Sequence, residues 1–111
     1  MPWFVKLETG LVEKARFDAV IPAHLAWLAE LERLGHQPRS GYWADRVGCT
    51  GDGAGGMLIF TAHNWAAAEA LVQTDPLIQE GCVSWCLHEW ALVFPKPGFP
   101  KPGFPKPADQ L

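Results

Sequence analysis

The sequence has 111 residues, of which 49% are hydrophobic and 19% charged, and its formal net charge is −3. This is the length of one domain with enough apolar residues for a core, which excludes disorder across the whole chain. The nine basic residues form no block, so nucleic acid is not an expected partner. Six tryptophans and six phenylalanines are a heavy aromatic load, and we expect some apolar surface to be buried against another subunit.

The N-terminus, "MPWFVKLETG", has no basic region followed by an apolar stretch, so it does not resemble a secretion signal. No apolar run approaches the ~18 residues that a membrane span needs. The three cysteines are an odd number, which does not suggest a disulfide framework. We therefore expect a soluble, reduced, cytoplasmic protein that does not contact a membrane.

The first strand is predicted over residues 3–8, and residues 13–34 then follow helical spacing. Apolar residues and one histidine step by three and four along this helix: Phe17, Val20, Ile21, His24, Leu25, Leu28, Leu31 and Leu34. Gly35 is well placed to end the helix. Pro22 is the difficulty, because proline fits a first turn but not a helix interior. Either the helix proper starts near Pro22, or a longer helix is kinked there.

The sequence of the rest of the domain predicts three strands, a turn and a second helix. They are an irregular strand at 36–48, a glycine-rich turn at 49–56, a strand at 57–62, a helix capped by Asn64 that ends by Asp75, and a long strand at 82–94. The order βαββαβ is that of an α+β, ferredoxin-like fold, an antiparallel sheet with two helices on one face. Neither side of residues 82–94 is cleanly polar, and helices can cover only one of them. We therefore expect the sheets of two copies to pair in a dimer.

Residues 94–107 repeat the motif "FPKPG" twice and then once without its glycine. Proline at this density favours an extended polyproline II path. The chain thus divides into a domain at 1–94 and a tail at 95–111. The tail is either a solvent-exposed extension with no partner or a segment that docks on a protein, with Phe99 and Phe104 as anchors.

Cysteine and histidine alternate along the last strand at Cys82, Cys86 and His88, which raises the question of a metal site. Same-face neighbours on a strand lie ~7 Å apart, whereas zinc ligands converge within about 2.3 Å of one ion. We expect core cysteines, no bound metal and no cofactor. "GDGAGG" opens a strand rather than a helix and lacks the lysine of a phosphate loop, so it is interpreted as a hairpin loop.

His24 is the one titratable residue on the inner stripe of the first helix. A lone histidine on an apolar face is most often a core residue whose nitrogens are satisfied. If the helix starts near Pro22, however, His24 lies in the first turn, where the helix dipole favours a neutral ring that can accept a proton. The sequence leaves both interpretations open.

Four segments, "PAHLAWLAELERLG", "RSGYW", "AAAEALVQTDPLIQEG" and "WALVF", resemble the YciI-like (YCII-related) family in their succession. The resemblance spans residues 3 to about 94 and implies a ferredoxin-like unit paired into a dimeric α+β barrel. It also implies a site in which His24 works with Asp75, and it makes Ser40, Gly41 and His88 candidate cavity-lining residues. The tail and the tryptophan content depart from the family pattern.

Three functions are therefore considered. The first is a small enzyme that uses His24 and Asp75 for general acid–base chemistry of lyase, isomerase or hydrolase type. Its substrate would be a small, aromatic or unsaturated organic molecule. The second is a non-catalytic module that binds such a molecule. The third is an interaction protein that docks a partner through its FPKPG tail.

Overall fold

A computed structural model describes residues 1–45 and 55–95 of the chain. Its elements are β1 (Trp3–Gly10), α1 (Lys14–Arg33), β2 (Arg39–Tyr42), β3 (Gly55–Thr61), α2 (Trp65–Val72), α3 (Pro76–Gln79) and β4 (Val83–Trp90). Most of the predicted glycine-rich turn and nearly all of the predicted tail lie outside the described residues. Within the described part, no helix is both long and apolar enough to cross a membrane.

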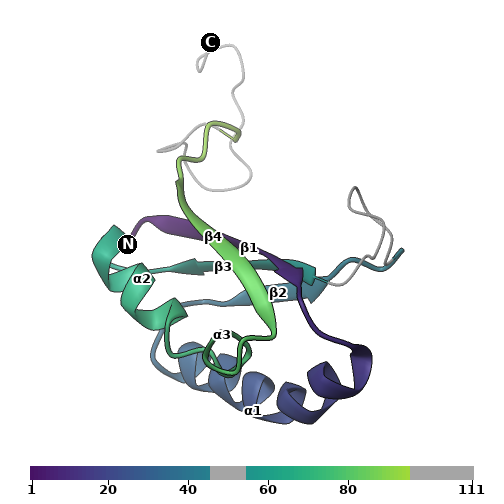
Figure 1. Cartoon of the computed structure of the whole chain (residues 1–111). Helices are drawn as coiled ribbons and strands as arrows, with labels where there is room; N and C mark the ends of the chain where they lie inside the picture. The colour runs from purple at the N-terminus through teal and green to yellow at the C-terminus, as the bar shows by residue number, and fades with distance from the viewer. Residues whose placement is uncertain (46–54, 96–111) are drawn as a thin grey trace, which may run out of the picture.

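The four strands form one sheet in the order β2-β3-β1-β4, and every neighbouring pair is antiparallel. The helices gather on one face of this sheet (Figure 1). This arrangement confirms the predicted α+β, ferredoxin-like fold. α3, a single turn that leads into β4, is an element that the sequence analysis did not predict.

α1 is one helix from Lys14 to Arg33 with Pro22 inside it. Of the two alternatives left open at Pro22, a helix that starts near the proline is not observed, because α1 runs through Pro22 and begins two turns earlier. His24 lies in the middle of α1, and the argument from the dipole of a first turn does not apply to it. The predicted end is confirmed, since Gly35 follows the helix with a φ of +90°, a conformation that glycine adopts without strain.

Two side-chain caps set the turns around α2 and α3. Asn64 precedes α2 and accepts a hydrogen bond from the backbone N–H of Ala67 at 2.8 Å, which confirms the predicted cap. Asp75 has an extended backbone, as a residue before proline prefers. It caps α3 by accepting a hydrogen bond from the N–H of Leu77 at 3.0 Å.

Two predicted strands are longer than the observed ones. The strand predicted at 82–94 ends at Trp90, and the strand predicted at 36–48 is reduced to Arg39–Tyr42. The glycines at 55 and 56, predicted as part of a turn, belong to β3. Gly56 is required there, because a Cβ atom would come within 2.1 Å of the carbonyl oxygen of Gly41.

The core lies between the sheet and the helices. Its main cluster of buried side chains joins β1, β3, β4 and α2: Phe4, Leu58, Phe60, Ala62, Ala68, Val72 and Leu87. A second cluster around Leu77, Cys82 and Val83 packs against α1. Cys82 is thus a core cysteine as predicted, but Cys86 is exposed, so its predicted core position is wrong.

The sheet face turned away from the helices is largely apolar, and we call it the open face. Strand alternation and register place on it the side chains of Trp3, Val5, Leu7, Met57, Ile59, Cys86 and Trp90, together with the polar residues Thr9, Arg39, Ser84 and His88. Leu7 is 36% and Trp90 46% exposed, and no described residue forms a layer over them. The helix-facing side of β1 instead carries Phe4, Lys6 and Glu8, so a lysine and a glutamate point inward.

Candidate active site

Asp75 holds the centre of the candidate site because the turn between α2 and α3 fixes its carboxylate. The side chain is completely buried. Its Oδ1 already accepts the N–H of Leu77, and it also lies 2.8 Å from Nδ1 of His24 on α1. The contact between His24 and Asp75 that the family resemblance implied is therefore present in the structure, although 51 residues separate the two in the chain.

The contact with Asp75 decides the tautomer of His24. An ionised carboxylate only accepts hydrogen bonds, so the proton of the neutral ring resides on Nδ1. Nε2 is then left with its lone pair, and no described residue hydrogen-bonds to it. His24 is buried at 7% exposure, yet it forms part of a cavity wall, so Nε2 is the atom that can act on a bound molecule.

Lys6 is a buried cation beside Asp75, and the sequence analysis did not identify it. Its ammonium group is 1% exposed and lies 2.8 Å from Oδ2 of Asp75 and 3.0 Å from Oε2 of Glu8. Burial by itself raises the pKa of Asp75, but the hydrogen bond from His24 and the charge of Lys6 outweigh it and hold that pKa below its ordinary value. Asp75 is therefore ionised at neutral pH.

Trp27 fixes the orientation of the His24 ring. The two rings are stacked with their centroids 5.8 Å apart and their planes 26° apart. The indole N–H donates to Oγ1 of Thr74 at 2.8 Å, one residue before Asp75. The ammonium of Lys6 also lies 5.8 Å from the centre of the indole ring, a cation–π distance. Trp27 thus contacts His24, Lys6 and Thr74, the residue before Asp75.

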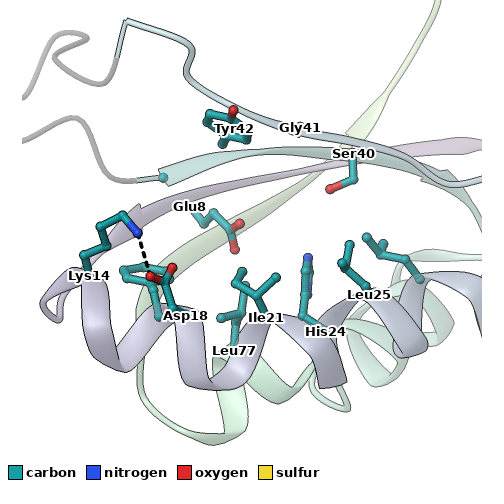
Figure 2. Close-up of a pocket in the computed structure, with 13 residues that line it drawn as sticks. Glu8, Lys14, Asp18, Ile21, His24, Leu25, Ser40, Gly41, Tyr42 and Leu77 are labelled. Carbon is teal, nitrogen blue, oxygen red and sulfur yellow. Dashed lines mark hydrogen bonds and ion pairs between the residues drawn. The ribbon is translucent and has the colours of Figure 1, made fainter.

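A cavity of about 520 Å³ lies between α1 and the β2 side of the sheet. Much of its wall is apolar, and its described lining comprises Glu8, Lys14, Phe17, Asp18, Ile21, His24, Leu25, Leu28, Ser40, Gly41, Tyr42, Gly55 and Leu77. Figure 2 shows His24 pointing from α1 toward the sheet, and Glu8 and Ser40 pointing from the sheet toward α1. Asp75 and Lys6 lie behind this wall rather than in it.

The other residues named from the sequence divide into two groups. Ser40 and Gly41 line the cavity through β2. His88 does not line the cavity, so its prediction as a cavity-lining residue is wrong. In the register of β1 and β4 it is opposite Val5, so its side chain lies on the open face, where its Nε2 is 3.6 Å from Sγ of Cys86. Leu25 and Leu34, predicted on the buried stripe of α1, are 57% and 52% exposed.

Lys6 and Glu8 were missed because the hydrophobic pattern of their strand indicates the opposite orientation. In "WFVKLE" the positions Trp3, Val5 and Leu7 are all apolar, and the simplest pattern turns them toward the core. The structure turns them away and points Lys6 and Glu8 at the helices. The sequence of one strand does not show which of its two sides packs against the helices; that depends on what covers each face of the sheet.

The comparisons with known proteins agree with this fold. Residues 5–89 match the family model of the YCII-related domain. This is most of the chain, and the chain therefore belongs to the YCII-related family.

Among solved structures, the chain is similar to the 5-chloro-2-hydroxyhydroquinone dehydrochlorinase TftG from Burkholderia phenoliruptrix AC1100 in complex with 2,5-dihydroxybenzoquinone. The two chains share 24% identity with a TM-score of 0.61, over 85% of this chain and 98% of that one. At this identity the likeness establishes the fold. No curated protein matches the chain.

Proposed function

We propose that this protein is a small enzyme in which His24, oriented by Asp75, transfers a proton to or from a small organic molecule bound in the cavity. The observation that carries the proposal is the position of the His24 ring. Its Nδ1 is bonded to a buried carboxylate at 2.8 Å, while the ring itself forms part of the cavity wall. A histidine that served only to fill the core would have no reason to face an open cavity.

The groups around His24 can balance the charge of a proton transferred to Nε2. Asp75 and Glu8 are two carboxylates, and Lys6 is one ammonium. When His24 accepts a proton, the four groups carry two positive and two negative charges, so the new imidazolium charge is balanced within the site. A carboxylate that holds one imidazole nitrogen also raises the basicity of the other. General acid–base catalysis of this kind contributes typically 10²–10⁴-fold to a rate.

The cavity indicates the kind of substrate. Its side walls are the apolar residues Phe17, Ile21, Leu25, Leu28 and Leu77, which suit a flat, apolar or aromatic body. The similar dehydrochlorinase is named for 5-chloro-2-hydroxyhydroquinone, and its structure contains bound 2,5-dihydroxybenzoquinone. We extend this to the present chain as a substrate class: hydroxylated aromatic or quinone-like molecules that undergo elimination or isomerisation.

Two assays test the proposal on the same protein samples. The first measures chloride release from 5-chloro-2-hydroxyhydroquinone, and the second measures deuterium exchange from D₂O into the ring of 1,2,4-trihydroxybenzene, which requires proton transfer but no leaving group. We expect the protein to accelerate at least one reaction and His24→Asn to lose 10²–10⁴-fold of that acceleration.

His63→Asn is the matched control, since His63 is an exposed histidine that does not line the cavity; it should retain full activity. If both compounds bind but neither reaction is accelerated, the protein is a ligand-binding module and the enzymatic proposal is wrong. Equal activity in the His24 and His63 variants would also contradict it.

A further inference from the structure

Glu8 is a polar group inside the cavity that the acid–base pair does not use. It comes from the inner side of β1, and its side chain is 13% exposed. Its Oε2 lies 3.0 Å from the ammonium of Lys6 but makes no well-oriented hydrogen bond, even though this atom is buried. Lys6 directs its well-formed hydrogen bond to Asp75 instead.

The other carboxylate oxygen of Glu8 is also without a donor. No described residue donates a hydrogen bond to Oε1, and Glu8 forms part of the cavity wall. In a largely apolar cavity, an anionic oxygen without a donor is costly unless water or a ligand supplies one. Oε2 is buried against the ammonium of Lys6, so Oε1 is the oxygen with unused capacity to accept a hydrogen bond from a ligand.

The sheet leaves room beside Glu8 for such a donor. In the strand register Glu8 is opposite Gly56, and Gly56 is opposite Tyr42. Glycine is the middle position of this row, and the space for a donor is the cavity itself, which Glu8 and Tyr42 both line. Figure 2 shows Glu8 reaching from the sheet toward α1, on the wall opposite His24.

From these observations we infer that Glu8 is a specificity-determining residue that accepts a hydrogen bond from a hydroxyl or N–H group of the bound molecule. The ligand is then held between two acceptors, the carboxylate of Glu8 and Nε2 of His24, with its apolar body against Ile21 and Leu25. This inference rests on the proposed function only in taking the cavity as the ligand site. It excludes fully alkylated or purely hydrocarbon ligands as good substrates.

The test compares two probes of the same shape, resorcinol with two hydroxyl donors and 1,3-dimethoxybenzene with none. Dissociation constants are measured by titration followed by NMR for the full chain, Glu8→Leu, Glu8→Gln and Glu32→Leu. Glu32 is the matched control, because it is an exposed carboxylate on α1 that does not line the cavity.

We expect the unmodified chain to prefer resorcinol, and Glu8→Leu to reduce this preference about ten-fold, the effect of one charge-assisted hydrogen bond. Glu8→Gln, which keeps the shape and loses the charge, should reduce it less, and Glu32→Leu should leave it unchanged. If Glu8→Leu fails to fold, the Gln variant alone decides.

An unchanged preference in the Glu8 variants, or no binding of resorcinol at millimolar concentration, would overturn the inference. These outcomes are independent of turnover. If the preference for resorcinol depends on Glu8 but no catalysis is observed, the proposed enzymatic function is wrong and Glu8 remains a ligand-binding residue. If catalysis is observed but the preference does not depend on Glu8, the inference about Glu8 is wrong and the proposed function remains.

Discussion

Asp75 has three partners, and each makes a different demand on it. It caps α3 through the N–H of Leu77, neutralises the buried Lys6, and orients His24. The first two are structural, so a change at Asp75 alters stability as well as any activity. Removing one member of a buried charge pair typically costs about 3–5 kcal/mol. This is why His24, rather than Asp75, is the residue whose substitution tests the proposed chemistry.

The lowered pKa of Asp75 predicts how stability depends on pH. Because the folded state holds that pKa below its unfolded value of about 3.9, the unfolded chain binds the proton first as pH falls. The stabilisation from ionised Asp75 is therefore complete above about pH 5 and is lost as pH falls through the folded pKa. Urea unfolding of the unmodified protein and Asp75→Asn should show a constant difference between pH 5 and 7 that shrinks below about pH 4.

Asp18→Asn provides the control for this pH series, since Asp18 is an exposed carboxylate on α1. Its free energy of unfolding should stay within about 0.5 kcal/mol of the unmodified protein at every pH, as surface substitutions usually do. A difference between the unmodified protein and Asp75→Asn that persists undiminished at pH 2.5 would show that Asp75 is not stabilised in its ionised form.

At the scale of elements, α1 forms despite a residue that opposes it. Pro22 has no N–H to donate to the carbonyl of residue 18, so one hydrogen bond is absent in the middle of the helix. The helix persists because tertiary packing, more than intrinsic propensity, stabilises helices in proteins. Leu31, Trp27 and Leu28 bury the second half of α1 against the core.

Pro22→Ala should therefore stabilise the protein. Proline in a helix interior is about 3 kcal/mol less favourable than alanine, and the alanine variant returns about 0.4–1 kcal/mol of this through a more flexible unfolded chain. We expect a net gain of roughly 2–2.6 kcal/mol, which raises the melting temperature by several degrees. Pro38→Ala, at a proline between α1 and β2, should show no gain, and a Pro22 variant that melts no higher than the unmodified protein would contradict the prediction.

At the scale of the whole molecule, the sequence predicted the order of the main elements and the fold, because periodicity and caps are local signals. It could not show that His24 and Asp75 touch, since only the packing of α1 against the turn before α3 brings them together; that contact was implied by the family resemblance. Lys6 and Glu8 escaped prediction for a related reason. A strand with one apolar and one mixed side does not reveal which side meets the helices.

The orientation of β1 leads to the last prediction, that the protein is a dimer joined through the open face. Three apolar side chains of this strand, Trp3, Val5 and Leu7, point away from the helices together with Thr9, while its inner side carries the charges of Lys6 and Glu8. A second copy packed on the open face would bury these side chains, as the sequence analysis expected.

Light scattering at micromolar concentration should give twice the mass of one chain, and Leu7→Arg should reduce the measured mass to that of a monomer. Leu11→Arg, at an exposed leucine beyond the end of β1, should leave the dimer intact. A monomeric unmodified protein, or a dimer that is indifferent to Leu7→Arg, would show that the open face is not the interface.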